Sequence, residues 1–78
     1  MMADLEVLVI EDCYAENETP KALLVRLPDD EEVWIPKGHI DDDSEVYERG
    51  HNGKLVITKW IAQQKGLIER GKLKYVGP

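Results

Sequence analysis

Residues 21–35, KALLVRLPDDEEVWI, decide the fold class, because they contain two alternating apolar segments separated by a turn. In the first segment every second residue from Leu23 to Leu27 falls on one face, as in a half-buried strand. Residues 28–31 (PDDE) are turn formers, since proline fixes φ and aspartate side chains bond to nearby backbone groups. Residues 32–35 resume the alternation, so the stretch predicts a β-hairpin.

Three more strands are expected outside this hairpin. Residues 5–10 (LEVLVI) carry apolar side chains on both faces, which indicates a strand buried on both sides. Residues 11–19 are acidic and polar and predict an exposed loop. A turn at 50–53 (GHNG) precedes a strand at 54–57, and residues 72–76 alternate as a last short strand.

One short helix is expected between the last two strands. Thr58 suits the N-cap of a helix over residues 59–65, and Gly66 suits the C′ position that ends it. Leu67 then stands where a Schellman motif places its hydrophobic contact. We expect this helix to bury its aromatic side, including Trp60.

The segment between the hairpin and the strand at 54–57 is less regular. Pro36 cannot donate to a β-ladder, so its strand ends there or lies at an edge, and residues 37–40 follow as a turn or short 3₁₀ helix. Asp42 and Glu45 have the spacing of a capping box. The segment that they begin, ending at Gly50, fits a helical turn and a short strand equally well.

These elements predict a single small domain over residues 1–78. A chain this short buries only about 60% of its unfolded surface, and closing the sheet removes exposed edges. We therefore expect a mainly β fold, a five-stranded antiparallel barrel of the SH3-like or OB-like kind. The short helix before the last strand favours the SH3-like form. Trp34 and Trp60 interrupt apolar patterns and are expected in the core.

The composition is that of a small acidic globular protein. It has 78 residues, 42% hydrophobic and 33% charged, with a formal net charge of -6. No apolar run is long enough to span a membrane, and the first residues lack a basic signal-peptide region. The single cysteine, Cys13, cannot form an internal disulfide. We expect a cytoplasmic protein with no membrane partner.

The charges are distributed unevenly along the chain. Residues 1–20 carry six acids and no Lys or Arg, and residues 21–53 carry nine acids and four bases. Residues 54–78 carry one acid and six bases. This asymmetry predicts either a bipolar surface that orients a partner or internal neutralisation of the acidic start by the basic end.

No metal, cofactor or catalytic site is expected from the motifs. His39, His51 and Cys13 stand in separate segments without zinc-ligand spacing. Residues 41–45 alternate like the start of a calcium loop but lack its later glycine and final glutamate. Cys13 or Ser44 would need a nearby histidine to act as a nucleophile, and the sequence has no nucleophile-elbow motif around either residue. It has no Gly-rich phosphate loop either. The sequence therefore favours a non-enzymatic role.

Two sequence blocks carry a resemblance. Residues 34–37 (WIPK) and 60–67 (WIAQQKGL), within a similarity that covers residues 21–67, resemble a group of short proteins of bacteriophages, prophages and plasmids. That group has no assigned activity, and it usually has Ser-Gln or Ser-Val where this chain has Gly38-His39. The resemblance implies an accessory protein of a phage or mobile element.

Two functions are expected, and the sequence leaves the oligomeric state open. The first is a module that binds a protein partner through a sheet face or through the edge formed by Trp34, Pro36, Lys37 and His39; its acidic excess suits a DNA mimic. The alternative is a single-stranded nucleic-acid binder, which needs basic and aromatic side chains on one face. Its candidate residues are Lys54, Lys59, Trp60, Arg70, Lys72, Lys74 and Tyr75.

Overall fold

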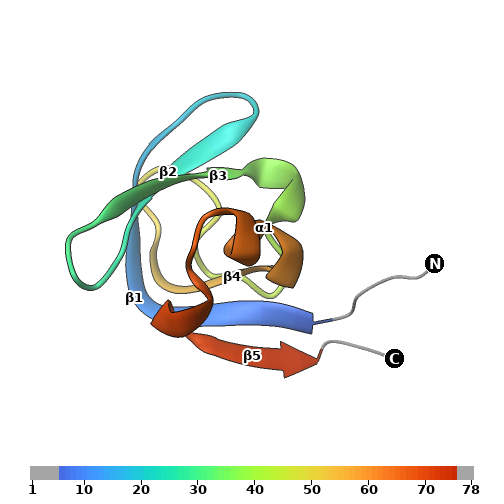
Figure 1. Cartoon of the computed structure of the whole chain (residues 1–78). Helices are drawn as coiled ribbons and strands as arrows, with labels where there is room; N and C mark the ends of the chain where they lie inside the picture. Colours follow the sequence, from blue (N-terminus) through green and yellow to red (C-terminus); the bar gives the residue numbers. More distant parts are fainter. Residues whose placement is uncertain (1–5, 76–78) are drawn as a thin grey trace.

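The computed structural model describes residues 6–75, which form five strands, one α-helix and two 3₁₀ helices (Figure 1). The elements in chain order are β1 (Glu6–Glu18), β2 (Ala22–Arg26), β3 (Glu32–Pro36), the 3₁₀ helix η1 (Lys37–His39), β4 (Asn52–Thr58), α1 (Lys59–Gln64), the 3₁₀ helix η2 (Ile68–Arg70) and β5 (Lys72–Tyr75).

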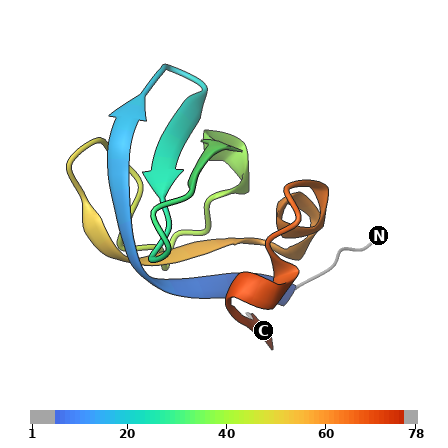
Figure 2. The same cartoon turned by 60° about the vertical axis from the view of Figure 1, so that its left-hand side comes forward.

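The strands form one antiparallel sheet organised by the long strand β1. The order is β3-β2-β1-β4, and β5 also pairs with β1. The first half of β1 lies between β4 and β5, whereas its second half pairs with β2. Figure 2 shows β1 bending between these halves. The mainly β class and the short helix before the last strand are confirmed.

The expectation of a closed barrel is not confirmed, because the described ladders leave the sheet open. The segment after β3 approaches β4 through one isolated bridge, between Ile40 and Ile57. That contact does not extend into a ladder. The chain turns away at Asp41 into an irregular loop, so β3 itself pairs with β2 alone among the described strands.

The hairpin expected at residues 21–35 is present as β2 and β3. Leu24 pairs with Trp34 at its centre. In the turn, the Leu27 N–H donates to the Glu31 carbonyl at 2.7 Å, and the Asp29 carboxylate accepts from the Glu31 N–H at 3.2 Å. The turn chemistry of the sequence therefore closes this hairpin locally.

The loop expected at residues 11–19 is wrong, because β1 continues to Glu18. The pairing register with β4 shifts between Ile10 and Cys13, and Asp12 takes a positive φ of 60° at this point. Beyond the bulge, Cys13 and Ala15 are fully buried. Two small residues thus continue the inner face, while the acidic side chains that suggested a loop face outward.

The core placement of both tryptophans is also wrong. Trp34 is 41% exposed and Trp60 is 54% exposed. The helix α1 is short and buries Ile61 and Ala62, not its aromatic side, and Trp34 lies outward on β3 while Ile35 is buried. Aliphatic side chains fill the core instead, mainly Leu8, Ile10, Leu23, Val25, Leu27, Ile35, Val46, Leu55, Ile57 and Leu67.

Both ends of α1 follow the sequence expectation. The Thr58 hydroxyl accepts from the Ile61 N–H at 3.2 Å, which caps the first turn. Gly66 has a φ of +70°, and the Leu67 N–H donates to the Ala62 carbonyl at 2.8 Å. This is the six-to-one bond of a Schellman motif, and Leu67 is buried as that motif requires.

The segment after η1 is neither a helical turn nor a strand. Its capping-box expectation is wrong, because the Glu45 carboxylate accepts from the Lys54 N–H on β4 at 2.8 Å. Ser44 is buried and its hydroxyl accepts from the Val56 N–H at 3.0 Å. These two bonds attach the irregular loop to the side of β4.

The other expected boundaries hold with small changes. The 3₁₀ option for residues 37–40 is confirmed by η1, and β4 begins at Asn52, inside the expected turn. Leu5 and Val76, which were expected in the first and last strands, lie outside the described residues. None of the described helices has the length and apolarity needed to cross a bilayer.

Candidate interaction surface

Exposed aromatic side chains mark the part of the molecule that is suited to binding. A large apolar side chain left in water loses the stabilisation of burial, so a group of them indicates a contact surface. Within residues 6–75, the large hydrophobic side chains that are exposed are Trp34, Tyr47, Trp60, Leu73 and Tyr75.

Trp60 is held in place by the 3₁₀ helix η1. Its ring stacks on His39 with 5.2 Å between centroids and 26° between planes. The His39 Nδ1 atom lies 3.0 Å from the Thr58 hydroxyl, the same hydroxyl that caps α1. The cap, the imidazole and the indole are therefore connected, and the exposed indole has a defined orientation.

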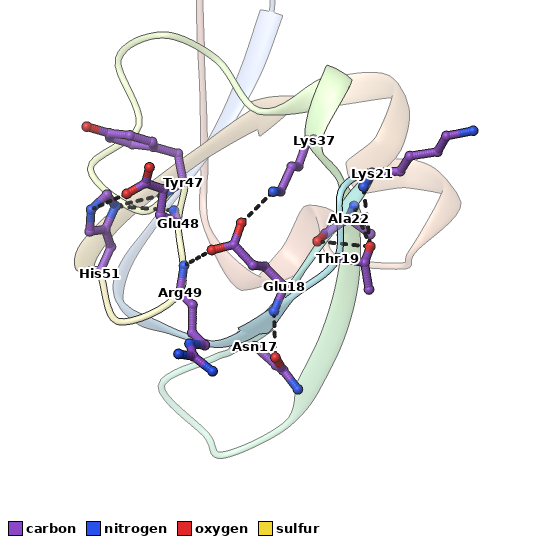
Figure 3. A network of polar contacts seen from close by, with 10 residues as sticks. All are labelled: Asn17, Glu18, Thr19, Lys21, Ala22, Lys37, Tyr47, Glu48, Arg49 and His51. Atoms are coloured by element: carbon purple, nitrogen blue, oxygen red, sulfur yellow. Dashed lines mark hydrogen bonds and ion pairs between the residues drawn. The ribbon is translucent and has the colours of Figure 1, made fainter.

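Tyr47 is held in a similar way by His51 (Figure 3). The rings meet edge to face at 4.4 Å and 73°. The His51 Nδ1 atom lies 3.3 Å from the Tyr47 N–H and 3.2 Å from the Glu48 N–H. Because two donors point at it, Nδ1 is the unprotonated nitrogen, and Nε2 faces the Glu48 carboxylate at 3.6 Å.

Glu18 connects the two segments that carry these rings. Figure 3 shows its carboxylate between the Lys37 ammonium and the Arg49 backbone N–H, which donates at 3.0 Å. The hydrogen bond from Lys37, followed by that from Arg49, lowers the pKa of Glu18 below its usual value. Glu18 at the end of β1 thus ties η1 to the loop that bears Tyr47.

An open hollow lies between these segments. It has a volume of about 320 Å³ and is lined by Lys37, Ile40, Asp42 and Tyr47. Lys37 is neutralised by Glu18, whereas Asp42 has no ion-pair partner among residues 6–75. We call Lys37, His39, Asp42, Tyr47 and Trp60 together the η1 surface. Lys37, Asp42 and Tyr47 line the hollow, and Lys37 shares η1 with His39, which stacks on Trp60.

The structure divides the residues expected to bind a protein partner. Lys37 and His39 lie in the η1 surface. Trp34 and Pro36 lie on the outward side of the hairpin, at the positions paired with Leu24 and Ala22. The sequence did not indicate Tyr47, since a lone tyrosine in an irregular segment has no periodicity to mark it as exposed.

Three of the residues expected to bind nucleic acid already have partners within the chain. Lys59 pairs with Glu6 at 2.9 Å, and Arg70 forms 2.6 Å ion pairs with both Asp29 and Glu31. Trp60 stacks on His39 instead of standing among lysines.

Only part of the expected basic face assembles. Lys54, Arg70, Lys72 and Lys74 line a groove of about 630 Å³ across β4, β1 and β5. A second hollow of about 280 Å³ is lined by Lys54, Lys74 and Tyr75 among others, and Tyr75 ends β5 in an exposed position. Glu11 and Asp12 line the larger groove, so it is mixed in charge.

The residues considered for catalysis and metal binding have other partners. Cys13 is buried, and burial together with nearby Asp12 and Glu11 raises its pKa to about 12, so it is a protonated thiol at neutral pH. Ser44 bonds to backbone groups, and each histidine contacts a different aromatic ring. Across residues 6–75 no three His, Cys, Asp or Glu side chains gather as a metal site would require.

Comparison of the chain with protein-family models, with curated proteins and with solved structures finds no match.

Proposed function

We propose that this protein is a non-enzymatic module that binds a protein partner through the η1 surface. The observation that carries the proposal is that Trp60 and Tyr47 are each 54% exposed and each fixed by a histidine. Tryptophan and tyrosine are enriched among the residues that dominate protein–protein binding energy. The hollow between Lys37 and Tyr47 gives the partner a place to insert a side chain.

The preorganisation of this surface supports the proposal. Ordering a mobile side chain on binding costs about 0.5–1.5 kcal/mol, and that cost falls when the side chain is already held. Thr58 holds the His39 ring, which in turn orders Trp60. Two backbone N–H groups hold the His51 ring, which in turn orders Tyr47. The hydrogen bonds of these two histidines hold exposed rings and do not contribute to packing of the core. Their arrangement therefore fits a role in binding best.

We propose the finer features of the module on the same basis. The bridge from Ile40 to Ile57 supports a small barrel of the SH3-like or OB-like kind, with these residues at the point of closure. The blocks at residues 34–37 and 60–67 support an accessory role in a phage or mobile element. The net charge of -6 supports a partner that otherwise binds nucleic acid, for which this acidic module would act as a mimic.

Site-specific photo-crosslinking in bacterial cells tests the proposal. A benzophenone amino acid replaces Tyr47 or Trp60, which keeps aromatic bulk at the site, and Glu69 on η2 serves as the exposed control. We expect one identified protein to be linked at both aromatic positions and not at the control. The purified pair should then bind at least about tenfold more weakly with Trp60→Ala. Equal linking at all three positions, or no linked protein, would refute the proposal.

The alternative function, binding of a single nucleic-acid strand, is favoured by the groove that Lys54, Lys72 and Lys74 share. A salt-titrated binding assay with short single strands separates the two functions. Binding that weakens steeply with salt and is lost in a Lys72→Gln, Lys74→Gln variant supports the alternative. No detectable binding at low salt refutes it.

A further inference from the structure

We propose that the partner segment recognised at the η1 surface is basic, with an arginine guanidinium placed against Tyr47 and paired with Asp42. This inference rests on the proposed function and adds the chemistry of the partner. It follows from the free side chains at the hollow, from an equivalent contact elsewhere in the molecule and from the local charge.

The molecule already contains one arginine bound in this manner. The Arg26 guanidinium lies 5.4 Å from the centre of the Tyr14 ring and forms a 2.8 Å ion pair with Glu16. A ring face and a carboxylate together suit a guanidinium, because its flat cation stacks on the ring while its N–H groups bond to the carboxylate. On the outer face of β1 and β2 this arrangement is satisfied within the chain.

The hollow beside η1 has the same two components without the cation. Tyr47 is 54% exposed and Asp42 lines the same hollow. Across the described residues no Lys or Arg forms an ion pair with Asp42. Lys37, the cation that lines the hollow, has its ammonium bonded to Glu18. An arginine supplied by a partner would complete the arrangement.

The charge of the loop that carries Asp42 and Tyr47 favours a basic partner over an acidic one. Residues 41–48 carry five acidic side chains and no Lys or Arg, and Arg49 alone follows them. An acidic peptide or a nucleic-acid strand would meet like charges here, whereas a basic segment would be attracted over several ångströms. The charge distribution therefore selects between the classes of partner that an aromatic hollow could accept.

The groove lined by Lys54, Lys72 and Lys74 gives weaker support for a ligand than the hollow does. Lys72 and Lys74 alternate along β5, which pairs with β1 alone among the described strands. Lysines on an edge strand discourage further strand pairing, so their placement is explained without a ligand. No comparable explanation accounts for Tyr47 beside an unpaired Asp42.

Titration with short peptides, followed by the backbone NMR signals of the full chain, tests the inference. The probes are a blocked Gly-Arg-Gly-Arg-Gly peptide and the same peptide with citrulline, which keeps the shape of arginine but not its charge. We expect the arginine peptide to shift the signals of residues 42–48 with weak affinity and the citrulline peptide to have little effect. Equal binding of both peptides would overturn the inference.

Matched variants identify the residues responsible. Asp42→Asn and Tyr47→Leu should each weaken binding of the arginine peptide by about threefold or more, the size expected of one exposed charge or cation–π contact. Asp30→Asn, in the exposed turn between β2 and β3, makes the same charge change away from the hollow and should leave binding unchanged. If Asp30→Asn weakens binding as much as Asp42→Asn, the attraction is non-specific and the inference fails.

The two proposals fail separately. If both positions crosslink one identified protein but arginine and citrulline peptides bind alike, the arginine inference is refuted and the proposed function stands. If the arginine peptide binds as expected but no protein is crosslinked, the site chemistry is supported and the proposed function is refuted.

Discussion

Replacing Ser44 by alanine should destabilise the fold and loosen the loop that carries Asp42 and Tyr47. The Ser44 side chain is almost fully buried, 5% exposed, and its hydroxyl makes contacts in two directions. It donates to the Val46 carbonyl at 2.8 Å and accepts from the Val56 N–H at 3.0 Å. The Val56 carbonyl accepts from the Asp41 N–H at 2.8 Å, so the N–H of the same residue also faces this loop and not β1, and alanine would leave it buried without a partner.

The magnitude follows from these two contacts. An unsatisfied buried group costs about 1–3 kcal/mol, and a lost hydrogen bond to the carbonyl costs about 0.5–1.5 kcal/mol. The Val46 N–H also donates to the Ser44 hydroxyl, at 3.3 Å. Losing that bond adds little to the destabilisation, because the same N–H donates to the Lys54 carbonyl at 3.2 Å. We therefore expect Ser44→Ala to lower the free energy of unfolding by about 2–4 kcal/mol. A loss this large is a substantial fraction of the stability of so small a domain.

Urea unfolding followed by far-ultraviolet circular dichroism measures this change, with Thr19→Ala as the control. The Thr19 hydroxyl also accepts a backbone N–H, from Ala22 at 3.0 Å, but it is exposed and water can replace it (Figure 3). The control should lose less than about 1 kcal/mol. If Ser44→Ala destabilises the protein no more than Thr19→Ala does, the loop is not anchored through this hydroxyl and the reasoning is refuted.

Three further outcomes are expected. Cys13 should resist iodoacetamide at pH 8 in the folded protein and react on unfolding. Burial raises the pKa of its thiol from 9.0 to about 12, so the thiol of the unfolded chain ionises at lower pH than that of the folded protein. The thiol therefore contributes to stability below pH 9, and this contribution is lost as the pH rises to 12. Rapid alkylation of the native protein would contradict this. Gly71→Ala should lower the melting temperature, because its added Cβ would lie 2.3 Å from the Val9 carbonyl oxygen, whereas Gly38→Ala meets nothing within 4 Å; equal melting temperatures would show that β5 adjusts freely. Trp60→Ala should cost under about 1 kcal/mol in a denaturation experiment, not the 3–5 kcal/mol of a core aromatic, because the indole is half exposed; a loss in the core range would place it in the interior after all.

Much of the fold could be predicted because it is encoded by neighbouring residues. The hairpin of β2 and β3 needs an alternation and a turn, and α1 needs a cap at Thr58 and a glycine at position 66, all within a few positions. The long strand β1 could not be predicted in full. Its second half carries polar residues, and burial of Cys13 and Ala15 depends on a bulge that only pairing with β4 reveals.

The candidate site was anticipated in part. Lys37 and His39 were expected at a binding edge, but Trp60 was assigned to the core and to the basic alternative, and Tyr47 was not indicated. What brings Tyr47 and Lys37 together is Glu18, which is 19 residues from Lys37. A contact over that separation leaves no local pattern to read.

The sequence by itself determined the strands of the hairpin, the ends of the helix and the acidic charge of residues 41–48, because each depends on bond geometry, capping or composition within one segment. Only the tertiary structure decided which aromatic side chains stay in water. A sheet side chain faces the core or the solvent according to strand pairing, and a helical side chain does so according to the direction in which the helix docks. Both Trp34 and Trp60 are apolar enough for the interior, but small and aliphatic residues from β1 to β4, from α1 and from the connecting segments fill it instead.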